Sequence, residues 1–151
     1  MQIESMTKLF KTRFLVSSDI ITCLALEKKS EMFLHRPLEW THVRGRETPV
    51  LFHEILSMES EIVSLLDVFN AAHLFYQKKD FELAKRGFDE CLLKCPDDGP
   101  SQLLAKRCDI YLQKGVPRGW AEGFHNSVPS GVLLFFFFLL PQRTTPLPLL
   151  N

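Results

Sequence analysis

The hydrophobic pattern of the first part of the chain predicts a strand followed by a helix. Residues 13–16 form a short β-branched and aromatic run, which is typical of a strand. Ser17, Ser18 and Asp19 are candidate N-caps, and the apolar positions of residues 20–27 recur at helical spacing. These positions therefore predict a strand and then a capped helix.

A hairpin is predicted next along the chain. Residues 32–43 form an extended segment that Pro37 interrupts, and residues 50–55 alternate imperfectly as a further strand. The stretch between them, 44–49, has turn composition, and Gly45 is expected to adopt the positive φ that residues with a Cβ avoid. The order strand, helix, strand, strand predicts an α+β arrangement of the βαββ type.

Residues 58–116 carry only helix signals, with apolar positions that recur at steps of three and four. Residues 78–80 end the first helix, residues 96–100 end the second, and Ser101 is a candidate cap for a third that stops at Gly115. Three antiparallel helices are therefore predicted. Their apolar stripes consist of Ile62, Leu65, Leu66, Phe69, Ala72 and Phe75; of Phe81, Ala84, Phe88, Cys91 and Leu92; and of Leu104, Cys108, Tyr111 and Leu112.

The chain changes character after about residue 118. The apolar run 132–140 contains four consecutive Phe, which fit neither helical nor strand periodicity. As a helix rising about 1.5 Å per residue, the run would reach roughly half of the roughly 30 Å hydrocarbon core, so no membrane-spanning segment is predicted. We interpret residues 123–151 as an apolar, unstructured tail that was never selected to fold. The alternatives are a tail that packs on the body and an interfacial contact.

The overall composition is that of an ordinary globular protein. Hydrophobic residues make up 46% of the 151 residues, and 18 Lys and Arg balance 18 Asp and Glu. Without net charge, the chain offers no long-range field that would hold a nucleic-acid backbone or an anionic bilayer. Nucleic acid is therefore not an expected partner.

The cysteines point to a reducing setting. Cys23, Cys91, Cys95 and Cys108 show no CxxC spacing, and no secretory leader is recognisable, which favours a cytoplasmic location. Cys91 and Cys95 lie one turn apart, with Cys108 and His73 near them in sequence, so a zinc cluster is an alternative. Because Cys91 belongs to an apolar stripe and no short Cys/His pair has the usual ligand spacing, we favour core packing.

The N-terminal segment allows a second interpretation. Residues 1–13 carry Lys8, Lys11 and Arg13 on a partly amphipathic stretch, which is a feature of transit peptides. The acidic Glu4 and the strand-like continuation disfavour this interpretation.

No set of residues predicts a catalytic nucleophile. His35, His42, His53 and His125 are scattered along the sequence, and no Ser or Cys stands in a recognisable nucleophile motif. Acyl-transfer chemistry is therefore not expected.

Two segments of the first region match the motifs of a known family. Residues 3–19, IESMTKLFKTRFLVSSD, are similar to a helix that continues as Leu/Ile-Glu-Ser and leads into a K-L-Y-G-T-R-I-L-V-S-E-D type stretch. Residues 43–56, VRGRETPVLFHEIL, match a closing hairpin V-K-G-K/R-x-x-P-V-x-V-Y-E-V-L nearly position for position. Both motifs belong to the class III adenylate or guanylate cyclase catalytic domain. The resemblance implies that residues 1–57 are the C-terminal part of such a domain, which has a ferredoxin-like fold.

Residues 58–122 are similar to the helical extension that follows such domains in many cyclases, which resembles a tetratricopeptide repeat (TPR). Small residues in this repeat let antiparallel helices approach, and aromatic residues fill the groove between them. The resemblance implies a three-helix, TPR-like segment. The matching positions are Ala72, Phe75, Ala84, Phe88 and Pro96, while Cys91 replaces a usual Ala.

The resemblance also implies which chemistry is missing. Class III cyclases convert ATP or GTP to a cyclic nucleotide and pyrophosphate, with two Mg²⁺ or Mn²⁺ ions held by paired Asp residues and with an Asn and an Arg that stabilise the transition state. The metal-binding part lies upstream of the matched segments. Gln2 stands at the position of the Arg, and the Asn would precede Met1. We therefore expect no catalytic residue, no metal ligand and no cofactor in this chain.

Arg44 is the one matched binding residue. It stands at the basic position before the hairpin glycine, which in the family lies near the nucleotide phosphates. A turn arginine standing alone is more commonly a solvated charge. We therefore expect ATP or GTP to be bound weakly if at all.

The sequence as a whole predicts a C-terminal cyclase fragment of cyclic-nucleotide signalling that is inactive alone. The alternative is a small, TPR-like protein–protein interaction module. One repeat plus a helix is below the about three repeats that normally make such an array stable. Self-association, association with another chain, or docking of the helices on the domain upstream of them is therefore expected.

Overall fold

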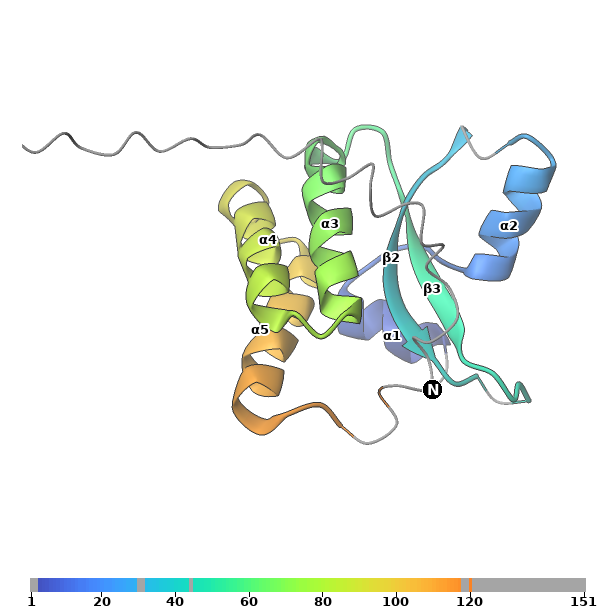
Figure 1. Cartoon of the computed structure of the whole chain (residues 1–151). Coiled ribbons are helices and arrows are strands. Elements are labelled where there is room, and N and C mark those ends of the chain that lie inside the picture. Colours follow the sequence, from blue (N-terminus) through green and yellow to red (C-terminus); the bar gives the residue numbers. More distant parts are fainter. Residues whose placement is uncertain (1–2, 30–31, 44, 118–119, 121–151) are drawn as a thin grey trace, which may run out of the picture.

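The computed structural model describes residues 3–29, 32–43, 45–117 and 120. It has a mixed α+β fold in which a small antiparallel sheet carries α3, α4 and α5 on one side and α2 on the other (Figure 1). The predicted α+β class is confirmed at this level. In chain order the elements are α1 (Ile3–Phe10), β1 (Leu15–Ser17), α2 (Ser18–Leu26), β2 (Leu34–Thr41), β3 (Val50–Leu56), the 3₁₀ helix η2 (Glu61–Leu65), α3 (Leu66–Gln77), α4 (Phe81–Lys94) and α5 (Gly99–Lys114).

The sheet consists of three antiparallel strands in the order β1-β3-β2. Strands β2 and β3 form the predicted hairpin, and Gly45 in its turn has a φ of +87°. A residue with a Cβ would be strained in this conformation, so the expectation for Gly45 is confirmed.

A β-bulge interrupts the β2–β3 register. Glu39 pairs with Phe52, whereas the next pair in the ladder is Pro37 with His53, so Leu38 is the extra residue. Because side chains alternate between the two faces of a strand, one extra residue exchanges the faces for the rest of β2. As a result Arg36 lies directly opposite Glu54, where an uninterrupted register would place Arg36 opposite Ile55.

The core lies between the sheet and the helices on one of its faces. Helix α3 packs against β2, α4 against α3, and α5 against α4. A Cβ added at Gly87 of α4 would lie 2.6 Å from the Cβ of Ala72 in α3, so these two helices approach too closely for a larger residue. One cluster of buried apolar side chains joins both predicted regions; it includes Met6, Phe10, Leu38, Phe52, Phe69, Ala72, Tyr76, Ala84, Phe88 and Leu104.

The opposite side of the sheet is thinly covered. Helix α2 lies there (Figure 1), and none of its residues is buried although most are apolar. Ile20 is 48% exposed and Leu26 is 79% exposed. The helix therefore contributes little to the core.

One predicted helix cap is confirmed and another is wrong. Ser17 is the N-cap residue of α2, as predicted, but its side chain forms no capping hydrogen bond. The expectation that Ser101 caps the last helix is wrong, because α5 begins at Gly99. Asp98 is the cap, and its carboxylate accepts a hydrogen bond from the Ser101 backbone N–H at 3.1 Å. Pro100 fits the first turn, where its missing N–H costs no helical bond.

The predicted apolar stripes face the core except at Leu112. In α3, the predicted Phe75 is half-buried against the core, and Tyr76 and His73, which the predicted stripe omits, are buried. In α5, Leu112 is 47% exposed, because Tyr111 takes the packing position against Trp120, with ring centroids 4.9 Å apart.

Candidate functional site

The residue that the sequence singled out for nucleotide binding, Arg44, lies outside the described residues, as do Gln2, His125 and the predicted tail, 123–151. The residues on either side of Arg44 in the turn are described. Arg46, just after the turn glycine, donates from Nη1 to the Asp19 carboxylate at 2.6 Å. This exposed ion pair connects the hairpin turn to the first turn of α2.

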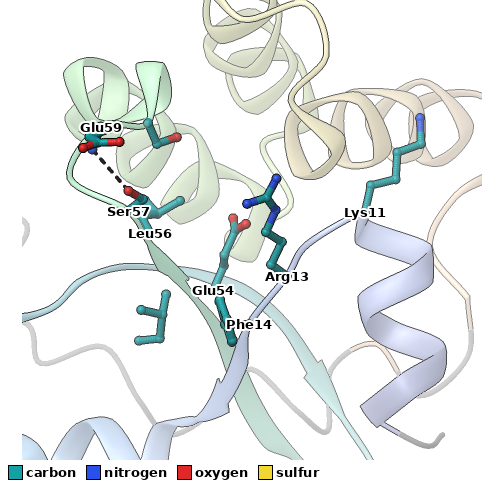
Figure 2. A pocket seen from close by; sticks show the side chains of 9 residues that line it. Lys11, Arg13, Phe14, Glu54, Leu56, Ser57 and Glu59 are labelled. Carbon is teal, nitrogen blue, oxygen red and sulfur yellow. Dashed lines mark hydrogen bonds between the residues drawn. The ribbon is translucent and has the colours of Figure 1, made fainter.

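A cleft of about 520 Å³ opens where the chain enters β1 and leaves β3 (Figure 2). One wall comes from the connection between α1 and β1, and the other from the connection between β3 and η2. Figure 2 shows the Arg13 and Glu54 side chains on the same side, with Ser57 and Glu59 opposite them. The cleft is lined by Lys11, Arg13, Phe14, Glu54, Ile55, Leu56, Ser57, Glu59 and Ser60.

The charges of this cleft are only partly paired. The Lys11 ammonium donates to the Gln102 side-chain oxygen at 3.2 Å. Within the described residues, the exposed Arg13 guanidinium has no hydrogen-bond or ion-pair partner. The cleft therefore presents a cationic edge that could contact an anionic group, but Glu54 and Glu59 balance its net charge.

Glu54, which lines the cleft, also belongs to a buried ion cluster. Arg36 is 1% exposed; it donates from Nε to Glu54 at 2.8 Å and from Nη1 to Asp98 at 2.9 Å. Its guanidinium carbon also lies 4.4 Å from the centroid of the Phe69 ring. Burial lowers the pKa of Arg36, but Asp98 and Glu54 outweigh this effect, so its pKa is raised. Burial raises the pKa of Glu54, and Arg36 opposes the rise.

Two further contacts connect the helices to the sheet. Arg107 of α5 forms a second ion pair with Glu39 of β2. His73 of α3 donates from Nε2 to the carbonyl oxygen of Leu38, the bulge residue, at 2.9 Å. Burial lowers the pKa of His73 to about 4, so this imidazole is neutral at neutral pH. With the Arg36 cluster, these contacts fix α3 and α5 on β2.

Two histidines that are far apart in the sequence meet in the sheet. The Nδ1 atoms of His35 and His53 are 3.2 Å apart, and the ring centroids are 5.0 Å apart. Burial lowers the pKa of both rings, and for His53 the neighbouring His35 and His73 lower it further, to about 4. No local pattern indicates this pair, because the two positions lie on different strands, 18 positions apart in the sequence.

The cysteines of the described residues form no metal site. Cys91, Cys95 and Cys108 are buried and free, and only Cys23 is an exposed thiol. Burial raises the pKa of Cys91 to about 11 and that of Cys108 to about 12, so both are protonated at neutral pH. No group of three or more His, Cys, Asp or Glu in the described part of the chain could hold a metal ion together. The predicted core position of Cys91 is confirmed.

The buried charged groups of the described residues support the fold. The most buried of them, in the Arg36 cluster, pair with one another and join β2, β3 and the start of α5. Sequence reasoning missed this cluster, although the Arg36 to Glu54 pairing follows once the bulge is known.

Comparisons with protein-family models, with curated proteins and with solved structures find no match for this chain. Among the helices in the described ranges, none combines the length and the apolar character needed to cross a membrane.

Proposed function

We propose that this chain is the C-terminal part of a class III nucleotide cyclase, with no cyclase activity of its own. In this role residues 1–57 complete the sheet of a catalytic domain, and residues 58–122 are a helical extension that supports it. The parent activity is the conversion of ATP or GTP to a cyclic nucleotide and pyrophosphate with Mg²⁺ or Mn²⁺. A cytoplasmic location belongs to the same proposal.

The observation that carries the proposal is the pair of motif matches, in the family's order, at residues 3–19 and 43–56. The elements found there are compatible with it: a helix and a short strand for the first segment, and a glycine turn with positive φ followed by a strand for the second. The metal-binding part of the family lies upstream of both matched segments, so the proposal gives this chain a structural role.

The geometry favours support over a free interaction module for the helices. Phe69 and His73 of α3 face the sheet, and Arg36 and Arg107 form ion pairs that cross between sheet and α5. A TPR-like groove that binds a partner requires an accessible apolar face. Here the apolar stripes of α3, α4 and α5 are used in the core.

The first test is an assay of the purified chain. With ATP or GTP and either Mg²⁺ or Mn²⁺, we expect no cyclic nucleotide above the background of a boiled sample. Turnover that increases with protein concentration and survives repurification would overturn the proposal.

A positive test uses a chimaera. The C-terminal part of a complete class III cyclase is replaced by this chain, so that the upstream metal-binding part and the motif Asn come from the complete enzyme. With Gln2 at the position of the motif Arg, we expect a low kcat, because Gln cannot place a positive charge against the developing phosphoryl charge. The Gln2→Arg chimaera should recover turnover by at least about 10-fold, by comparison with other removed transition-state donors.

The matched control is Gln2→Lys, which restores charge without the bidentate geometry of Arg and should recover less. A folded chimaera that is inactive with Gln2 and stays inactive after Gln2→Arg would contradict the proposed relationship. Folding is checked by near-UV circular dichroism and by gel filtration.

A further inference from the structure

The bulge in β2 creates the contact between His35 and His53. His35 pairs with Ile55 across the strands, and His53 pairs with Pro37, so the two imidazoles are diagonal neighbours on one face. In an uninterrupted register His53 would stand opposite Leu38, and His35 opposite Leu56, which places the two histidines on opposite faces. The extra residue Leu38 therefore brings the two side chains together.

The separation of the two nitrogens suits a shared metal ion. Zn²⁺ binds imidazole nitrogen at about 2.0 to 2.1 Å, so two nitrogens on one tetrahedral ion are about 3.3 to 3.4 Å apart. For ligands at right angles around the same ion the separation is about 3.0 Å. The observed distance between the Nδ1 atoms of His35 and His53, 3.2 Å, lies between these values.

Both rings are also chemically suited to the role. A metal ligand needs a deprotonated, neutral imidazole nitrogen, and burial lowers the pKa of both His35 and His53. Both side chains are half-buried rather than fully enclosed. Imidazole suits Zn²⁺, Cu²⁺ and Ni²⁺, whereas Mg²⁺ and Ca²⁺ prefer oxygen ligands.

We infer that His35 and His53 form a two-histidine site for a divalent transition metal ion of the Zn²⁺, Cu²⁺ or Ni²⁺ class, which bridges β2 and β3. The two Nδ1 atoms occupy two coordination positions, and water fills the others. The ion joins neighbouring strands in the folded state only, so binding stabilises the hairpin. This site is independent of the cyclase proposal, in which Mg²⁺ or Mn²⁺ is held by carboxylates of another part of the domain.

The competing explanation is a hydrogen bond between the two rings. One neutral tautomer can donate its Nδ1–H to the bare Nδ1 of the other ring, and the 3.2 Å distance permits this. Such a pair would hold no ion. The two explanations differ in whether added metal changes the protein.

The test is a titration of the untagged full chain with NiCl₂ alone, followed by calorimetry, and melting curves in the same series. We expect one Ni²⁺ per chain and a higher melting temperature at saturation. His35→Gln and His53→Gln should each weaken binding by at least about 10- to 100-fold, since losing even a group that only supports a ligand costs that much. MgCl₂ should have no effect on the melting temperature.

Two variants serve as matched controls. His42→Gln removes an exposed histidine near the same hairpin, and Cys23→Ser removes the exposed thiol; both should bind Ni²⁺ as the unaltered chain does. No binding by the unaltered chain, or binding that survives both His35→Gln and His53→Gln, would overturn the site and leave the hydrogen-bonded pair.

If circular dichroism without metal shows that these variants do not fold, an NMR titration of the unaltered chain still tests the site. Paramagnetic Ni²⁺ should broaden the amide signals around residues 35 and 53 first. Broadening centred elsewhere, or none, would contradict the site.

Discussion

The two faces of the β2–β3 hairpin differ sharply although the same strands build both. The face toward α3 and α5 carries Arg36, Glu39 and Glu54, and all three are paired with charged groups. The face toward α2 carries the His35–His53 pair and a helix without a single buried residue. The bulge at Leu38 determines which side chains reach which face.

This difference shows where the chain obtains its stability. The buried apolar area lies on the side of α3 and α5, so the free energy of folding depends mainly on that side, and the charges buried there must stay paired. The α2 side is open, with exposed apolar side chains at Ile20 and Leu26 and a short edge strand, β1. Open edges and exposed apolar surface promote association, so any aggregation of the isolated chain should begin there.

The largest expected effect comes from removing a buried ring on the side of the sheet that α3, α4 and α5 cover. Phe88 is fully buried in α4, the helix that packs against both α3 and α5. Phe88→Ala should lower the free energy of unfolding by about 3 to 5 kcal/mol. Phe14 is 66% exposed, so Phe14→Ala is the matched control and should change stability by less than about 0.5 kcal/mol. Urea denaturation measures both, and equal losses would contradict the contrast between the faces.

A slightly smaller loss is expected from the buried ion cluster. Arg36→Met leaves the Glu54 and Asp98 carboxylates close together without their cation, which should cost about 3 kcal/mol. Arg46 pairs with Asp19 at the surface, and Arg46→Met should cost less than about 1 kcal/mol. An Arg36→Met protein as stable in urea as the unaltered chain would show that the cluster does not hold the helices on the sheet.

The pH dependence of stability should report the buried His73. Its pKa is about 4 in the folded chain and 6.5 for an ordinary histidine, so the unfolded chain binds the extra proton between these values. Stability should therefore be constant above about pH 6.5 and fall as the pH drops toward 4, by at most about 1.4 kcal/mol per pH unit for this group. His73→Gln should make the curve shallower, and His53, whose pKa burial also lowers to about 4, should account for the slope that remains. A curve that His73→Gln leaves unchanged would mean that this imidazole is not buried neutral.

The smallest effect is expected on the α2 side of the sheet. Leu26→Gln changes a residue that is 79% exposed on α2, so the free energy of unfolding should change by less than about 0.5 kcal/mol. The same substitution should raise the highest concentration at which the protein is still monomeric in gel filtration, because it removes exposed apolar surface. A destabilisation above about 2 kcal/mol would show that α2 packs more closely than described.

Much of the local structure could be predicted from the sequence. The strand predicted at 50–55 is found at Val50–Leu56, and the helix predicted at 20–27 is found at Ser18–Leu26. Hydrophobic periodicity and turn residues act over a few neighbouring positions, which is why they locate elements. Helix α1 followed only from the resemblance to the cyclase motif, and Met6 and Phe10 from this helix lie in the core.

The Arg36 cluster and the His35–His53 pair could not be predicted from the sequence, for a physical reason. Pro37 signals an interrupted strand, but it does not say which residue is left unpaired or on which strand. A shift of one residue reverses every later side chain, so the Arg36 to Glu54 and His35 to His53 pairings remain hidden until the register is known. The choice of Asp98 as the α5 cap is similarly tied to its contact with Arg36, 62 positions away in the sequence.

The most direct test of the contrast between the two faces is native-state hydrogen exchange of the backbone amides. We expect that amides in the middle of α3 and α4 exchange only through global unfolding, while those of α2 exchange through local opening of much lower free energy. Protection of the α2 amides equal to that of α4 would contradict the contrast.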